Sequence, residues 1–338
     1  MTDAPNGLAE LHTHLGGSVA SDILWSLAHE QGIALPVKDY WAFDALVTVS
    51  DPRGVENLDA LDAIYHWVEL IQSSPLAVER SVHGAIGGAY RSQGITTLEL
   101  RFNPMKRNRG GERDLDHIIL AAVRGLDRAR LEYPQVRAGL ILMMDRTFDH
   151  RQNEVIVEKA IRWAARGIVG VDIAGPRPGG LRYDYTQVAP MVETAREAGL
   201  GITIHVGEEG GVHGREEIGE VVEHLRPDRI GHGILAAEDA ELMTLLHEAG
   251  VVLEICPTSN LLTKALPDEG AIRDTIRRFL EHEVAFTIAT DGPEMMRTHL
   301  RDELDLLLRI GALGEPELAA VNELGHSVSF VNRTRTFV

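Results

Sequence analysis

Residues 229–255, RIGHGILAAEDAELMTLLHEAGVVLEI, carry the pattern that decides the fold. Two short β-rich runs, Arg229–His232 and Val251–Ile255, enclose an amphipathic stretch over Ala240–Ala249. Gly250 follows that stretch at the position where a helix C-terminal cap is expected. A near-continuous apolar run such as VVLEI is typical of a strand buried on both faces of a parallel sheet. This segment therefore predicts a strand–helix–strand unit.

The same alternation extends along the chain. Eight β-rich runs are expected: Leu8–His14, Ile95–Phe102, Val136–Met144, Ile168–Ala174, Gly201–Val206, Arg229–His232, Val251–Ile255 and Val284–Thr290. Helical patterns lie between the later runs: Leu115–Leu131, Asn153–Arg166, Gln187–Ala198, Ala240–Ala249 and Ala271–Glu281. Eight strands that alternate with helices predict an α/β fold, a (β/α)8 TIM-type barrel, rather than an open sheet.

The interval between the first two β-rich runs is too long for a simple connection. It holds about eighty residues, whereas most connections are far shorter. Three helical patterns lie in it: Ser21–Gln31, Val55–Ile71 and Leu76–Ser92. We therefore expect a helical insertion, at about residues 20–93, that forms a lid or wall at the barrel mouth. Because no linker or low-complexity tract follows, one domain over residues 1–338 is expected.

The composition narrows the possible partners. Of the 338 residues, 51 are acidic and 33 are basic, which gives a formal net charge of −18. This charge disfavours nucleic acid as a partner, because a phosphate backbone requires a basic face. The single cysteine, Cys256, excludes an intrachain disulfide and fits a reducing compartment. Since no secretion signal and no long apolar stretch occur, we expect a soluble, cytoplasmic protein without membrane partners.

Side chains that can bind a metal follow several of the predicted strands at their carboxyl ends, where barrels carry their reactive groups. They are His12, His14, His205, Glu208, His232 and Asp291. His12 and His14 are two apart on one strand, so both imidazoles face the same side. A lone His-x-His pair is more often a surface or core feature, but burying all six groups without a metal is costly. Three imidazoles and one carboxylate suit zinc and leave one position open for water.

Other motifs are weaker. Gly231–Ala236 fits the dinucleotide pattern G-x-G-x-x-A, but it occurs late in the chain and His232 stands between its glycines. A cytidine-type zinc deaminase needs at least two cysteines at its metal, and this chain has one. We interpret Cys256 as a buried structural thiol rather than a nucleophile. No P-loop, H-E-x-x-H or G-x-S-x-G pattern occurs.

Six segments together carry a family resemblance. ELHTHLGG, VDIAG, HVGEEGG, RIGHG, EICPTSN and TDGPEMM, in this order, resemble the adenosine deaminase family of the metal-dependent amidohydrolases. The resemblance implies one zinc ion per chain, bound by His12, His14, His205 and Asp291. It also implies that Glu208 shuttles protons and that His232 orients the attacking water. Gly175, in VDIAG, matches a backbone position that contacts the purine ring in relatives.

The residues suit that chemistry. Zinc lowers the pKa of bound water to about 7 and so supplies hydroxide at neutral pH. A protonated Glu208 can donate to N1 of a 6-aminopurine, which draws electron density away from C6 and prepares it for attack. Burial near the substrate ring would raise the Glu208 pKa as this role requires. The alternative interpretation of Glu208 is a solvated loop acid.

Two positions depart from the family pattern. Relatives that act on adenosine carry an acid just after the His-x-His-Leu, where it meets the ribose 5′-hydroxyl, and here this position is Gly16. Many relatives carry a second Asp that meets the purine N7, and here this position is Gly292. Losing these contacts should weaken recognition of adenosine by about 1–3 kcal/mol each, unless neighbouring side chains or waters replace them.

Gly16 also leaves space for a larger 5′ substituent. Basic residues are expected near the same mouth: Lys106, Arg107, Arg109 and Arg113 after the second run, and Arg177 beyond Gly175. They could bind an anionic tail, although a solvated charged loop would look the same in the sequence. We therefore hypothesise a 6-aminopurine nucleoside with a bulky or carboxylated 5′ group. Within the family, 6-aminodeoxyfutalosine, which bears a benzoate, is the best named candidate and would imply menaquinone synthesis.

Three other functions stay open at this point. The protein could deaminate plain adenosine, or free adenine or another aminated heterocycle. It could cleave an amide or ester, since one barrel supports many hydrolyses, but Glu208 argues against this. A non-catalytic metal-binding barrel is disfavoured because the full set of six side chains is present. In each enzymatic case the partner is a small molecule.

Overall fold

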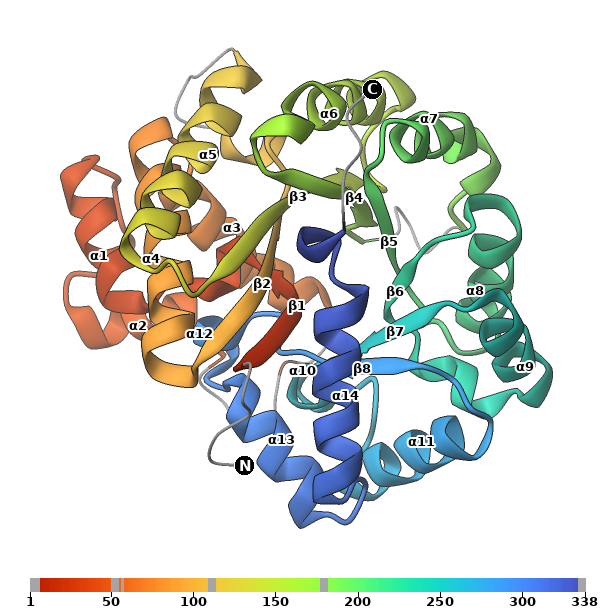
Figure 1. Ribbon diagram of the computed structural model, residues 1–338. Helices are drawn as coiled ribbons and strands as arrows, with labels where there is room; N and C mark the ends of the chain where they lie inside the picture. Colours follow the sequence, from red (N-terminus) through yellow and green to blue (C-terminus); the bar gives the residue numbers. More distant parts are fainter. Residues whose placement is uncertain (1–6, 50–54, 56–57, 109–113, 177–181, 334–338) are drawn as a thin grey trace.

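The computed structural model describes residues 7–49, 55, 58–108, 114–176 and 182–333. Within these ranges, eight parallel strands follow one another in sequence order around a barrel (Figure 1). They are β1 (Leu8–His14), β2 (Ile95–Phe102), β3 (Arg137–Asp145), β4 (Ile168–Ala174), β5 (Gly201–Val206), β6 (Arg229–His232), β7 (Val252–Ile255) and β8 (Phe286–Ile288). The predicted (β/α)8 barrel is confirmed.

Helices surround the strands on the outside (Figure 1). Those that connect successive strands include α5 (Leu115–Glu132), α6 (His150–Trp163), α7 (Tyr185–Glu197), α8 (Gly211–Leu225), α9 (Ala240–Ala249), α10 (Pro257–Leu262) and α11 (Glu269–Glu281). After β8 the chain adds α12 (Pro293–Met296), α13 (Leu300–Arg309) and α14 (Glu315–Val328). In the part of the chain that the structure describes, no helix is both long enough and apolar enough to cross a membrane.

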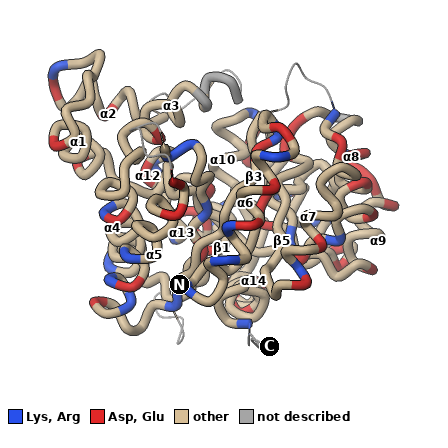
Figure 2. Tube along the Cα trace, turned by 90° about the horizontal axis from the view of Figure 1, so that it is seen from above, with Lys and Arg blue, Asp and Glu red and all other residues tan. Residues whose placement is uncertain are grey.

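The described residues between β1 and β2 form four α-helices, where three were expected. They are α1 (Ser21–Glu30), α2 (Tyr40–Val47), α3 (Leu58–Ile71) and α4 (Pro75–Gln93). The unexpected helix, α2, spans only eight residues, and its start is fixed by Asp39, whose carboxylate accepts from the Ala42 amide at 3.0 Å. Figure 2 shows α3 at the same edge of the molecule as α10, while α14 lies toward the opposite edge.

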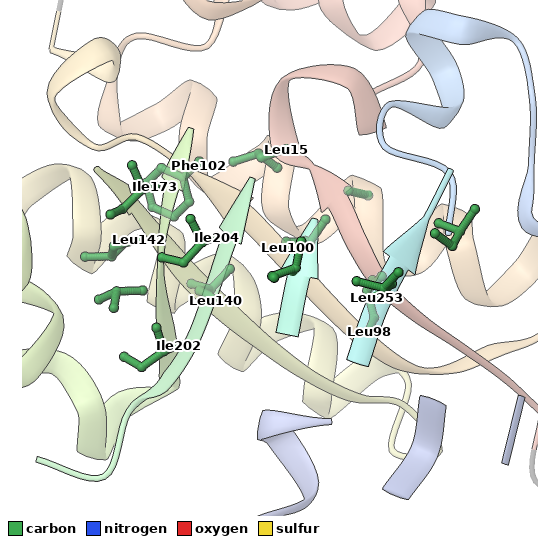
Figure 3. Packing of buried hydrophobic residues seen from close by; sticks show 14 of the residues in the cluster. Leu15, Leu98, Leu100, Phe102, Leu140, Leu142, Ile173, Ile202, Ile204 and Leu253 are labelled. Atoms are coloured by element: carbon green, nitrogen blue, oxygen red, sulfur yellow. The ribbon is translucent and has the colours of Figure 1, made fainter. Parts of the chain in front are cut away.

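The two faces of β2 have different chemistry. Leu98, Leu100 and Phe102 belong to the main apolar cluster (Figure 3). This cluster also includes side chains from the surrounding helices. Glu99 and Arg101 alternate with them and therefore point to the other face, into the barrel. The barrel interior is thus partly ionic, which a near-continuous apolar sequence pattern does not predict.

The amino-terminal end of the barrel is closed by η6 (Phe330–Asn332), a short turn that follows α14. The Phe330 ring fills space left by Gly170, where a Cβ atom would lie 2.9 Å from the ring. The Arg229 guanidinium lies 3.6 Å from the centre of the same ring and also pairs with Glu99. Aromatic and ionic contacts therefore seal this end together.

The seam between the last and first strands is short. The barrel closes through a single parallel bridge between Thr13 and Asp291, three residues beyond β8. The His14 amide donates to the Asp291 carbonyl at 2.7 Å, and the Asp291 amide donates to the His12 carbonyl at 2.9 Å. The predicted strand Val284–Thr290 is too long, because the backbone leaves the strand conformation before Asp291, whose φ is 65°.

Candidate active site

A cavity of about 340 Å³ opens at the carboxyl ends of the strands. Most of the residues singled out from the sequence line it: His14, Gly16, Arg107, Gly175, His205, Glu208, His232 and Asp291. His12 lies directly behind His14 and is fully buried. Arg177 falls outside the described residues, as do Arg109 and Arg113. The structure thus brings side chains from β1, β5, β6 and the segment after β8 to one place.

The three histidines and Asp291 form a compact donor set. Ligand atoms of His12, His14 and His205 all lie within 4.8 Å of one another. Nε2 of His14 lies 3.0 Å from Nε2 of His205 and 3.3 Å from Oδ1 of Asp291. Two ligands at about 2.0–2.1 Å from a tetrahedral ion lie roughly 3.4 Å apart, so these separations suit one small ion.

His12 supplies a further test of this fit. Its Nε2 atom is buried and has no hydrogen-bond partner among the described residues, while it lies 3.8 Å from Oδ1 of Asp291. Its Nδ1 atom lies 2.6 Å from Oε2 of Glu254. A carboxylate at Nδ1 fixes the proton there and leaves the lone pair of Nε2 directed at the cluster. The donor set therefore fits a bound cation.

A buried ion network holds these imidazoles in place. Asp172 lies 3.0 Å from Nδ1 of His205 and accepts from Arg101 at 3.0 Å, while Arg101 also reaches Glu254 at 2.8 Å. Burial raises the pKa of Asp172, but His205 and Arg101 together lower it to about 2. Burial, together with nearby positive charges, also lowers the pKa of His12 well below its usual range. The carboxylates stay ionised and the histidine stays neutral, as metal binding requires.

Glu208 and His232 lie next to each other at the cavity. Oε2 of Glu208 lies 3.5 Å from Nε2 of His232. Burial raises the pKa of Glu208, although His205 opposes this effect. Burial also lowers the pKa of His232 to about 4, with further lowering by His205 and Arg101. Burial therefore shifts the Glu208 carboxyl toward its protonated form, and the His232 imidazole is uncharged at neutral pH.

Two of the site residues have unusual backbones. His232 has φ 63° and Asp291 has φ 65°, values that side-chain-bearing residues rarely adopt. Such conformations cost stability and persist where the surrounding structure holds them, often at functional sites. Ser259 contributes here, because its hydroxyl donates to Oδ2 of Asp291 at 2.7 Å.

Tyr65, on α3, fills space beside both unusual glycines. A Cβ atom on Gly16 would lie 3.3 Å from the Tyr65 ring and 3.3 Å from Nη2 of Arg107. A Cβ atom on Gly292 would lie 3.6 Å from the Tyr65 hydroxyl. The Arg107 side chain is buried at the cavity, whereas Lys106 pairs with Asp145 at 2.6 Å. The predicted neighbourhood of Gly16 and Arg107 is therefore present, and Tyr65 is an addition to it.

Gly175 lies on the cavity wall with φ +88°. A Cβ atom there would lie 2.7 Å from the Asp145 carboxylate, so a larger residue would clash. Its carbonyl accepts from Arg146 at 2.8 Å. This contact fixes the orientation of the peptide at the position that the sequence resemblance assigned to purine binding.

The comparisons with known proteins agree with this geometry. The family profile described as adenosine deaminase matches residues 7–336. The chain belongs to the adenosine deaminase family. An adenosine deaminase of Vibrio vulnificus strain CMCP6 is 30% identical over 308 residues, which cover 91% of this chain and 89% of that protein. An adenosine deaminase of Pectobacterium atrosepticum is 29% identical over 337 residues, covering 98% of this chain and 95% of that one. Membership of this family makes the protein a hydrolytic deaminase.

Solved structures share the fold of this family member. An adenine deaminase from Arthrobacter aurescens has a TM-score of 0.81 at 21% identity, covering 96% of this chain and 94% of that one. An amidohydrolase from Burkholderia ambifaria, solved with bound zinc, has a TM-score of 0.83 at 22% identity, covering 98% and 90%. Both likenesses bear out the barrel architecture.

Sequence reasoning missed the residues that hold the histidines. Arg101, Asp172 and Glu254 lie in strands that read as buried, and each charge meets partners on other strands that are distant in the sequence. A signal was available, because Asp172 and Glu254 lie inside the family segments VDIAG and EICPTSN. Buried carboxylates in apolar strands require partners, and those partners could have been sought among the ligands.

Proposed function

We propose that this deaminase is a zinc-dependent aminohydrolase that converts a 6-aminopurine nucleoside and water to the 6-oxo product and ammonia. The observation that carries the proposal is the pairing of a four-residue donor set with a buried carboxyl at one cavity wall. Relatives named adenosine deaminase, and neighbours named adenine deaminase and N6-methyl-AMP deaminase, support purine chemistry.

The zinc ion would be held by His12, His14, His205 and Asp291. When bound, zinc supplies Lewis-acid activation of water at neutral pH. Glu254 and Asp172 would keep the rings of His12 and His205 turned toward the ion, through their contacts at Nδ1.

Glu208 would act first on the substrate. Burial raises the pKa of this carboxyl and so favours its protonated form; its proton passes to N1 of the purine and makes C6 electrophilic. Water adds to C6 and loses a proton to Asp291. His232 is neutral and orients the water by hydrogen bonding. The proton held by Asp291 passes to the amino group, the C6–N bond breaks and ammonia leaves, while the C6 hydroxyl becomes the 6-oxo carbonyl and returns its proton to Glu208.

We infer further that the nucleoside carries an acidic 5′ substituent. The support is the buried guanidinium of Arg107 beside Gly16, a position where an acid would have repelled an anion. The best named candidate is 6-aminodeoxyfutalosine, which would assign the enzyme to menaquinone synthesis. Plain adenosine or adenine is the second candidate, and it is favoured by Tyr65, which fills the space of both missing acids.

The test is a substrate comparison on zinc-loaded protein with metal content measured in parallel. The kcat/KM for ammonia release would be compared for 6-aminodeoxyfutalosine, AMP, adenosine and adenine. We expect the benzoate-bearing substrate to exceed adenosine by at least tenfold, and Arg107→Gln to remove most of that preference. Equal or greater activity on adenosine would reject the 5′ part, and no ammonia from any of the four would reject the purine function.

A further inference from the structure

The segment from β7 into α10 touches several site residues. Glu254 contacts His12, and Ser259 donates to Asp291. Two further residues of the segment, Asn260 and Thr263, reach Glu208. This segment is the EICPTSN motif and its continuation, and the proposed reaction steps do not use Asn260 or Thr263.

The Asn260 side chain lies between an imidazole nitrogen and a carboxyl oxygen. It is fully buried, and its Nδ2 atom lies 3.1 Å from Nδ1 of His232 and 3.5 Å from Oε1 of Glu208. Oε1 of Glu208 accepts from Nδ2 and from the Thr263 hydroxyl. Nδ2 carries two N–H groups, so the second can serve His232 when Nδ1 is unprotonated.

The rest of the Asn260 amide argues against a purely structural role. Its Oδ1 atom is buried and has no hydrogen-bond partner among the described residues. A buried, unpartnered carbonyl lowers stability, so the amide is retained at a cost to the fold. The two contacts of Nδ2, both with residues of the site, offset that cost.

We propose that Asn260 is a positioning residue for the deamination reaction, donating one N–H to Nδ1 of His232 and the other to Oε1 of Glu208. His232 is then held with its proton on Nε2, directed toward the cavity. Glu208 accepts at Oε1, which leaves Oε2, 3.5 Å from His232 Nε2, to carry the proton delivered to substrate. This inference rests on the proposed function for its kinetic consequence, but the tautomer of His232 does not depend on the substrate.

Thr263 contacts Glu208, one of the two site residues that Asn260 reaches. Its hydroxyl lies 3.2 Å from Oε1 of Glu208 and 3.0 Å from the Ser259 carbonyl oxygen. Thr263 hydrogen-bonds to Glu208 and not to His232. Thr263 therefore offers a variant that disturbs the carboxyl while leaving the imidazole alone.

The kinetic test uses Asn260→Leu, which is of similar size and donates nothing. We expect kcat to fall about 100-fold with KM within threefold of wild type, because the substrate still binds but the acid and imidazole lose their orientation. Asn260→Ala serves if the leucine variant does not fold. The matched control is Asn322→Leu, which removes a buried amide at the other end of the barrel and should leave kcat within twofold. Thr263→Val should lower kcat less than tenfold.

The second readout is the ¹⁵N chemical shift of His232 in the metal-loaded protein. We expect an unprotonated Nδ1 in wild type and in Thr263→Val, and a shift toward exchange between both tautomers in Asn260→Leu. A protonated Nδ1 in wild type would overturn the proposal whatever the substrate. So would an Asn260→Leu enzyme that keeps kcat within threefold of a catalytically active wild type.

Discussion

The two ends of the barrel are built from the same strands but differ in how their buried polar atoms are paired. At the amino-terminal end, Arg229 donates to Glu254 at 2.6 Å and to the Val328 carbonyl at 2.9 Å, and it also pairs with Glu99. At the carboxyl-terminal mouth, His12 Nε2 and Asn260 Oδ1 have no hydrogen-bond partner in the described chain. Strained φ angles occur at the mouth as well, at His232 and Asp291.

Stability and chemistry are thus divided between the two ends of the barrel. Satisfied charges and a tightly fitted ring at one end stabilise the fold, whereas buried acceptor atoms without a partner among the described residues leave groups at the other end ready to bind and react. Substitutions at the amino-terminal end should therefore change the free energy of unfolding. Substitutions at the mouth should change metal content, turnover or selectivity.

The largest effect is expected for Asp291→Ala. It removes one proposed zinc ligand while the main-chain contacts of the seam can persist, so we expect loss of bound zinc and a fall in kcat/KM of about 1,000-fold or more. Metal analysis of the purified variant beside wild type gives the first measurement, and ammonia release gives the second. A variant with full zinc content would show that Asp291 is not a ligand.

Glu208→Gln separates proton transfer from metal binding at the same mouth. The amide has the same shape but no transferable carboxyl proton, so we expect unchanged zinc content and a fall in kcat of about 100- to 10,000-fold. Turnover within threefold of wild type would remove Glu208 from the mechanism.

Phe330→Ala tests the opposite end. Losing the buried ring should lower the free energy of unfolding by about 3–5 kcal/mol, measured by urea denaturation. Because the ring lies at the sealed end, kcat/KM of the folded variant should stay within about threefold. A tenfold loss of activity in folded protein would mean that the two ends are not separable.

Glu303, on α13, gives a pH-dependent test of the support behind the mouth. Burial raises its pKa from 4.5 to about 7, although hydrogen bonds from Thr298 and Thr258 oppose this. Because the pKa is higher in the folded state, protonation of Glu303 stabilises the fold; this contribution is full below pH 4.5 and is lost as pH rises through about 7. Between these limits the free energy of unfolding changes by about 3 kcal/mol. Urea denaturation at several pH values should show a flatter profile for Glu303→Gln, and an identical profile would contradict the assignment.

Gly16→Asp should give the smallest effect, confined to selectivity. The new carboxylate would lie beside Arg107 and neutralise it, so the preference for an anionic 5′ group over adenosine should fall about tenfold, or 1.4 kcal/mol. Gly16→Ala, which adds bulk without charge, separates the steric part from the electrostatic part. If both variants keep the wild-type ratio of kcat/KM values, position 16 does not contact the 5′ end.

Much of this arrangement was accessible from the sequence, because local patterns carried it. The bounds of β1, β2, β4, β5 and β6 match the predicted runs. The ends of these strands led to His12, His14 and His205, which the structure brings within one cluster. Helix α2 was missed because it is short, and Tyr65 was missed because its neighbours, Gly16 and Gly292, are distant in sequence.

The barrel seam has a consequence for how the chain opens. His12 and His14 lie on one side of the seam and Asp291 on the other, and one bridge with two amide contacts joins them. An ion bound by all three would act as a clasp across the first and last strands. Dissociation of the ion would require local opening of this seam. Amide hydrogen exchange at His14 and Asp291 would therefore report the rate at which the first and last strands separate.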